Sequence, residues 1–182
     1  MNLNALVPLP ARSDINTGLS PATQYTMIHT LGVPGKPTRD CGPITNQRLR
    51  SQIFHHQFNN FGIEGWRPGV ELFKRAMDDV YHEDRELHAS IGTAGMLCCR
   101  LVRGGSNMSN HSWGTAIDIT INGKLIPLGS TVCYVGLLKL YRYMHRYGFY
   151  WSAGLPGRKD AMHFELAEQM IVRLYRQYYG AP

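Results

Sequence analysis

SNHSWGTAIDITI, residues 109–121, joins a polar loop to a stretch of alternating hydrophobicity. Isoleucine occupies every second position from 117 to 121, and smaller or polar residues stand between: Ala116, Asp118 and Thr120. Such alternation is typical of a strand with one buried face. Asn122-Gly123 follows, a pair that favours a tight hairpin turn. The sequence therefore predicts a strand over 115–121 that turns back into a short strand over 124–126.

The same stretch contains two candidate metal ligands, His111 and Asp118. A charged Asp118 between two isoleucines is costly to bury without a partner, and a divalent cation would supply one. A second string, Asp160-Ala161-Met162-His163-Phe164-Glu165, adds another imidazole and a spare carboxylate. Three protein ligands, an open position for water and a nearby base are what a hydrolytic zinc site needs. We therefore expect one Zn²⁺ per chain, held by His111, Asp118 and His163.

The combined pattern also resembles a known family. Ser-x-His-x-x-Gly-x-Ala-x-Asp at 109–118, followed by acid-x-x-His at 160–163, is similar to the zinc D-alanyl-D-alanine carboxypeptidases and L-alanyl-D-glutamate endopeptidases (VanY-like), which cut peptide stems of bacterial peptidoglycan. The resemblance covers roughly residues 92–168. It implies a hedgehog/DD-peptidase-like fold and gives Asp160 the role of catalytic base. Many relatives carry Glu at this position, so the shorter Asp160 fits the endopeptidase-like lysins better.

Other polar residues fit supporting roles. The resemblance implies an arginine on the strand before the motif, a place that Arg100 fits best and Arg103 next; either could stabilise charge on a carbonyl oxygen or hold a substrate carboxylate. Glu165 is two residues after His163, hence on the same strand face, and we interpret it as an orienting partner of an imidazole rather than a ligand. Three further residues are candidates for substrate contact or cleft walls: Ser109, Trp113 and Trp151.

The remaining histidines lack matched spacing, and we interpret them as ordinary core or surface residues: His29, His55, His56, His82, His88 and His145. The four cysteines include no Cys-x-x-Cys pair, and the adjacent Cys98 and Cys99 would point to opposite strand faces. We therefore expect all four to be reduced and mostly buried.

Hydrophobic periodicity predicts an α+β fold, with a small antiparallel sheet flanked by helices. Irregular segment 1–43, rich in Pro and Gly, is expected to form an N-terminal arm, and 44–182 a single catalytic domain. The expected helices cover 45–58, 68 to about 84–86, 136–147 and 167–178. Further strands are expected at 96–102, 150–151 and 162–166.

The chain has 182 residues, 43% of them hydrophobic, and a formal net charge of +6. This charge suits an anionic partner such as a cell-wall polymer but equally an ordinary basic surface. Sequence motifs for nucleic-acid binding and apolar runs long enough to span a membrane are absent, so neither partner is expected. The first residues lack the pattern of a signal peptide. We therefore expect synthesis in the cytoplasm and delivery to the cell wall or periplasm by a holin or a secretion system.

Together these features predict a zinc metallopeptidase that hydrolyses peptidoglycan stem peptides, most simply an endolysin or a secreted effector with L-Ala-D-Glu endopeptidase activity. A D-Ala-D-Ala carboxypeptidase or dipeptidase is the alternative within the same class. A non-catalytic metal- and wall-binding module is the alternative outside it, although an intact Asp160 argues against a mere binder. A basic nucleic-acid binder would rest on charge alone.

Overall fold

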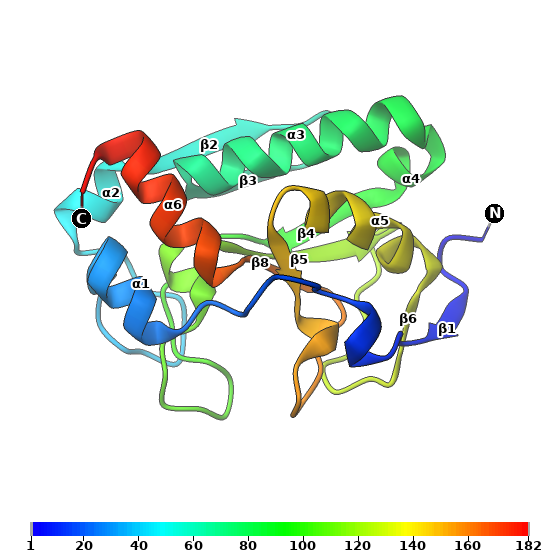
Figure 1. Ribbon diagram of the computed structural model, residues 1–182, viewed down its shortest axis with the longest axis horizontal. Coiled ribbons are helices and arrows are strands. Elements are labelled where there is room, and N and C mark those ends of the chain that lie inside the picture. The colour runs from blue at the N-terminus through cyan, green and yellow to red at the C-terminus, as the bar shows by residue number, and fades with distance from the viewer. Residues whose placement is uncertain (1, 182) are drawn as a thin grey trace.

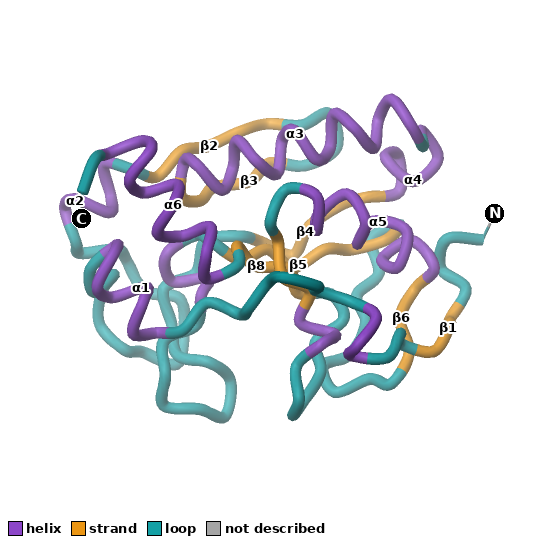
Figure 2. Tube along the Cα trace, in the orientation of Figure 1, coloured by secondary structure: helices purple, strands orange, loops and turns teal. Residues whose placement is uncertain are grey.

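The computed structural model describes residues 2–181 and has the α+β architecture that the sequence predicts (Figure 1). Its centre is a four-stranded antiparallel sheet in the order β4-β5-β8-β7. Two further pairs, β1 with β6 and β2 with β3, lie outside this sheet (Figure 2). The strands are β1 (Leu6–Pro8), β2 (Ile53–Gln57), β3 (Gly62–Trp66), β4 (Ile91–Gly95), β5 (Ala116–Ile121), β6 (Val132–Tyr134), β7 (Phe149–Trp151) and β8 (His163–Leu166). The α-helices are α1 (Gln24–Leu31), α2 (Gln47–Ser51), α3 (Arg67–Glu83), α4 (Arg85–Ser90), α5 (Val135–Arg146) and α6 (Glu168–Tyr179).

The two faces of β5 separate the core from the polar site. Its isoleucines are fully buried on one face, on the side of α3 and α5: an added methyl group at Gly69 of α3 would meet Leu166 of β8, and one at Gly136 of α5 would meet Ile121. Asp118 lies on the opposite face and pairs in register with His163 of β8. Because side chains alternate along a strand, this register brings both polar residues to the same face.

Three predicted helices are confirmed by α3, α5 and α6. Pro68 stands in the first turn of α3, where its missing N–H costs nothing, and Gly148 follows α5 with φ of 81°. The apolar residues that recur at helical period in α3 are buried at Val70, Phe73, Met77 and Val80, whereas Tyr81 is 41% exposed. Strand β5 and the Asn122-Gly123 turn, with φ of 50° and 72°, are also confirmed.

Three predicted elements are wrong. The short strand expected over 124–126 is reduced to an isolated bridge between Ile121 and Lys124. The helix expected over 45–58 ends at Ser51, and Ile53–Gln57 instead forms β2, paired with β3. Hairpin pairing supplies partners for the backbone of this β-branched and aromatic segment, which overrides the helical spacing of its apolar residues. The strand expected over 96–102 is displaced to β4, Ile91–Gly95, and the later residues form a loop with isolated bridges such as Gly42 with Cys99.

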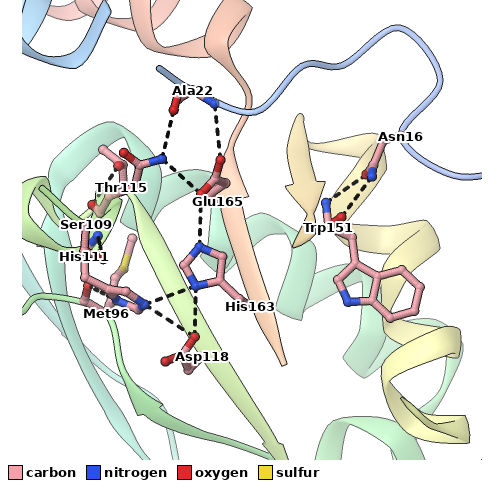
Figure 3. Close-up of polar contacts among 11 residues, drawn as sticks. Asn16, Ala22, Met96, Ser109, His111, Thr115, Asp118, Trp151, His163 and Glu165 are labelled. Carbon is pink, nitrogen blue, oxygen red and sulfur yellow. Dashed lines mark hydrogen bonds and ion pairs between the residues drawn. The ribbon is translucent and has the colours of Figure 1, made fainter. Parts of the chain in front are cut away.

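The N-terminal segment is more ordered than the irregular arm that the sequence predicts. It contains β1, a short 3-10 helix at Arg12–Asp14, and α1. Asn16 ties it to the sheet edge, because its side chain accepts from the Trp151 N–H at 2.8 Å and donates to the Trp151 carbonyl at 2.9 Å (Figure 3). Contacts with distant parts of the chain thus order a proline-rich segment. The domain boundary at residues 43 and 44 remains a prediction.

The expectation of four reduced cysteines is wrong for Cys41 and Cys98, which form a disulfide across a sequence separation of 57 residues. The pairing depends on the N-terminal segment folding back against the chain after β4, where Gly42 N–H donates to the Cys99 carbonyl at 2.9 Å. Local sequence spacing does not reveal such a contact. Cys99 and Cys133 are free and buried, as expected.

Removal of this disulfide is expected to destabilise the fold. A bridge that closes a loop of this length restricts the unfolded chain and contributes about 2–4 kcal/mol. Denaturant unfolding of the Cys41→Ser, Cys98→Ser double variant should show that loss relative to the oxidised protein. Reductant should lower the midpoint of the unmodified chain and leave that of the variant unchanged; an unmodified chain that is insensitive to reductant would contradict the bridge.

Candidate active site

Three side chains converge on one point (Figure 3). One ligand atom from each of His111, Asp118 and His163 lies within 4.8 Å of the others, and residues 2–181 contain no other such group of histidine, cysteine and acidic side chains. His111 Nε2 is 3.4 Å from Asp118 Oδ1 and 3.2 Å from His163 Nδ1, which is itself 3.0 Å from the same aspartate oxygen. The expected ligands therefore come together as two imidazole nitrogens and one carboxylate oxygen.

A tight turn brings His111 to the strand that carries Asp118. His111 lies in a 3-10 helix, Asn110–Trp113, capped by Ser109, whose hydroxyl accepts from the His111 N–H at 3.4 Å. Gly114 ends this turn with φ of 65°, in the left-handed region that favours glycine. A Cβ at Gly114 would lie 2.6 Å from the Cα of Gly65 in β3. Glycine is thus required at position 114 by both backbone conformation and space.

A second layer of contacts fixes the two imidazole rings. The carbonyl of Met96 accepts from His111 Nδ1 at 2.9 Å, which leaves Nε2 of the neutral ring free to act as a ligand. Glu165 Oε2 accepts from His163 Nε2 at 3.0 Å, on the opposite edge of the ring from the cluster. Glu165 is held in turn by the side-chain amide of Asn110 at 3.0 Å and by the Ala22 N–H at 3.2 Å. These contacts are of the kind that orients metal-bound histidines.

Asp118 and His163 shift each other's pKa values. Burial alone would raise the pKa of Asp118, but hydrogen bonds from His111 and His163 outweigh it and lower that pKa well below its usual range. Burial alone would lower the pKa of His163, but its hydrogen bonds to Asp118 and Glu165 raise it to about 10. The carboxylates that favour a proton on His163 would equally favour a cation at the point where the three side chains converge. Metal binding at such a site displaces that proton.

The cluster lies in a cavity of about 720 Å³. Its lining includes most of the residues that the sequence singles out: Arg100, Arg103, Ser109, His111, Asp118, Asp160, His163 and Glu165. Arg100 is partly buried and donates from Nη1 to the Leu101 carbonyl at 2.9 Å, whereas Arg103 is exposed. Neither arginine lies on a regular strand, contrary to the strand expected over 96–102. This volume falls in the range that is typical of ligand-binding pockets.

Asp160 lines this cavity with a side chain that is only partly satisfied. Its Oδ1 atom is buried and has no hydrogen-bond partner. Burial raises the pKa of Asp160, although the nearby His163 opposes the rise. A buried, unpartnered carboxylate oxygen normally costs stability, so its presence beside a metal-ligand cluster points to a chemical use.

Trp113 and Trp151 do not line the cavity, contrary to their predicted contact with substrate. Both side chains are fully buried. Each indole N–H donates to a backbone carbonyl, that of Gly32 at 2.7 Å and that of Ala161 at 2.8 Å. The large apolar area of tryptophan favours core packing when a carbonyl satisfies its N–H. These two residues therefore belong to the core that supports the site.

Sequence reasoning missed several contributors. The Met96 carbonyl and the Ala22 N–H are backbone groups, so no side-chain pattern indicates them. Asn110 stands inside the motif, and its position next to His111 was the one available signal. Arg158 also lines the cavity. Its position two residues before Asp160 could have suggested that it lies near the carboxylate of that residue.

Substitution of Glu165 by Gln is expected to weaken metal binding by about 10–100-fold. The change preserves the shape of a buried side chain and removes the charge that holds His163. Competition with a chromophoric chelator measures the affinity. The matched control is Glu64→Gln at an exposed position of β3, which should bind metal like the unmodified protein; equal affinities for both variants would contradict the role of Glu165.

No helix among the described residues has the length and apolar character needed to cross a membrane. Residues 103–166, roughly a third of the chain, match a family model described as D-alanyl-D-alanine carboxypeptidase. Searches of the curated proteins and of the solved structures find no match to this chain. The segment that is similar to the carboxypeptidase family contains His111, Asp118, Asp160, His163 and Glu165.

Proposed function

We propose that this protein is a zinc-dependent peptidase that hydrolyses the peptide stems of bacterial peptidoglycan. One observation carries the proposal: His111, Asp118 and His163 converge on a point inside a cavity that also contains the unpartnered carboxylate oxygen of Asp160. Two imidazoles and a carboxylate are a donor set that suits zinc and leaves a position for water. The similarity of residues 103–166 to D-alanyl-D-alanine carboxypeptidases supports the same conclusion.

A zinc ion held by His111, Asp118 and His163 would supply a Lewis acid that lowers the pKa of a bound water to about 7. Asp160 accepts one proton from the attacking water and returns it to the leaving amine. The C–N bond of the amide breaks and a C–O bond forms, so one water is consumed and no oxidant is needed. Glu165 keeps His163 oriented through the reaction. Arg100 lies along the cavity and stabilises the negative charge that develops on the carbonyl oxygen.

Within this class we propose an endopeptidase that cleaves the L-Ala-D-Glu type of bond, as an endolysin or a secreted effector would. The reason is the aspartate at position 160, which fits the lysin branch that the motif resembles. The alternative is a D-Ala-D-Ala carboxypeptidase or dipeptidase, which the description of the matching family favours. Digestion of purified sacculi followed by mass spectrometry of the fragments distinguishes the two. Fragments with a new N-terminal D-Glu support the endopeptidase, and release of free D-Ala or its dipeptide supports the alternative.

The same digestion tests the class. Zinc-loaded protein should release amino groups from sacculi, chelated protein should not, and added zinc should restore the activity. Cleavage that is equally fast after metal removal would end the proposal. Metal binding and wall binding without any cleavage would favour a non-catalytic module.

We further propose that the protein acts outside the cytoplasm, after delivery by a holin or a secretion system. Its proposed substrate lies there. The disulfide between Cys41 and Cys98 supports this location, because such bonds persist in the periplasm and outside the cell rather than in the reducing cytoplasm.

A further inference from the structure

We propose that Arg158 is a specificity-determining residue that binds a carboxylate of the substrate, and that the preferred substrate is therefore an acidic peptide. The inference rests on the proposed function and names the chemistry that the same site selects. It follows from the charges around the cavity, the position of Arg158 and the hydrogen bonds that Arg158 leaves unused.

Three arginines line the cavity without acidic partners: Arg100, Arg103 and Arg158. Elsewhere in residues 2–181, ion pairs join arginine to carboxylate, as between Arg146 and Asp79 at 2.7 Å, but none involves these three. An arginine side chain at a cleft usually finds a carboxylate or a phosphate when one is in reach. Residues 2–181 supply no such partner here, so a bound molecule could provide one.

Two of the three carboxylates of the cavity are already committed to His163. Asp118 and Glu165 contact the His163 ring. Asp160 lies close enough to His163 for the charge of that histidine to lower the pKa of Asp160. Three arginines and three carboxylates balance, so a divalent cation at the ligand cluster leaves a net excess of two positive charges when both histidines are neutral. A low-dielectric cavity with this excess favours an anionic ligand.

Of these three arginines, Arg158 is the best placed to bind a part of the substrate that lies away from the metal ligands. It stands two residues before Asp160, and both residues line the cavity. Its aliphatic part lies beside Gly129, where an added Cβ would come within 3.5 Å of Arg158 Cγ. The Gly129 N–H also donates to the Lys159 carbonyl at 2.8 Å, which joins the two loops.

The guanidinium of Arg158 is held by one hydrogen bond and keeps its other N–H donors available. Nη2 donates to the Arg103 carbonyl at 2.8 Å, across to the loop that follows Arg100. The other N–H groups of the exposed guanidinium make no hydrogen bond to residues 2–181. A guanidinium held at one corner presents its remaining donors to a carboxylate in a fixed orientation, which favours a directional contact.

The cavity also has apolar walls beside these arginines. Three exposed apolar side chains line it: Val102 at 43%, Leu125 at 42% and Leu128 at 37%. Apolar walls suit the aliphatic portions of a peptide, and the arginines suit its acidic groups. This combination favours a carboxylate-bearing peptide over a polyphosphate or a nucleic acid.

The test compares two probes and two proteins. The probes are a synthetic acidic stem tetrapeptide with free carboxylates and the same peptide with every carboxylate amidated. Calorimetry measures the binding of each to zinc-loaded Asp160→Asn protein, which limits turnover, with Arg158 intact or replaced by Gln. Arg158 should give the acidic peptide an advantage of about 10-fold or more, the size of one charge-assisted hydrogen bond. R158Q should lose about that factor for the acidic peptide and little for the amide.

Two further variants distinguish carboxylate binding by Arg158 from an effect on loop structure and from an effect of the protein's overall charge. R158K keeps the positive charge but loses the paired N–H donors of the planar guanidinium, so its affinity for the acidic peptide should be intermediate. Arg85→Gln makes the same charge change at an exposed position over Tyr81, outside the cavity, and should leave both affinities unchanged. Equal weakening of both peptides in R158Q would show that Arg158 only shapes the loops, and would overturn the inference.

The outcome is independent of the proposed catalysis. If unmodified protein cleaves sacculi but R158Q keeps the full preference for the acidic peptide, Arg158 is not the determinant and the inference fails alone. If the preference depends on Arg158 but zinc-loaded protein releases no fragments, the peptidase proposal fails and the acidic-peptide site stands. A protein with Arg158 intact that does not prefer the acidic peptide also overturns the inference.

Discussion

Replacement of His163 by Ala is expected to abolish metal binding and peptidase activity together. His163 contributes Nδ1 to the cluster and lies within 3.2 Å of both other candidate ligand atoms. The loss of an outer partner alone typically costs 10–100-fold in metal affinity, so removal of a ligand should exceed about 10²-fold. Metal analysis after gel filtration and the rate of amino-group release from sacculi measure the two effects.

The matched control is His82→Ala at an exposed position of α3, which should keep both metal and activity. Because His163 contacts two carboxylates, its removal also takes a hydrogen bond from each of Asp118 and Glu165 and is expected to lower stability. His163→Asn, which keeps a polar group of similar reach, should remain folded by circular dichroism and still fail to retain zinc. A folded His163 variant with one equivalent of tightly bound zinc would contradict the proposed ligand set.

Replacement of Asp160 by Asn is expected to separate catalysis from metal binding. Asp160 is not in the converging ligand group, so zinc content should remain near one equivalent. Loss of a general base typically lowers the rate by about 10²–10⁴-fold, and the effect should fall mainly on kcat. Steady-state kinetics on a stem peptide, with metal analysis of the same sample, measures both quantities.

The stability of this variant gives a second readout. Burial raises the pKa of Asp160, so folding disfavours its charged form, and in the metal-free protein that cost grows as the pH rises through the raised pKa. Asn carries no charge, so the free energy of unfolding at neutral pH should not decrease. Asp78→Asn on the exposed face of α3 serves as the control for both activity and stability. Full activity in the Asp160 variant would require a different base.

The elements that could be predicted from sequence are those whose signals are local. The alternation of residues 116–121 indicates β5, and Pro68 and Gly148 mark a helix start and a helix end. The motif spacing identified His111, Asp118 and His163, because metal chemistry restricts which residue types can ligate. Local and long-range preferences disagree at Ile53–Gln57. There the segment forms a strand paired with β3, although its apolar residues have helical spacing.

The sequence by itself determined which chemical groups are available to the candidate site: two imidazoles and two aspartate carboxylates at restrictive spacings. Only the tertiary structure decided that Trp113 and Trp151 belong to the core, that Cys41 meets Cys98, and that Arg158 faces the same cavity as Asp160. Residue type limits which chemistry is possible at a position. Contacts between distant segments decide burial and proximity, because they depend on how the whole chain packs rather than on neighbours in sequence.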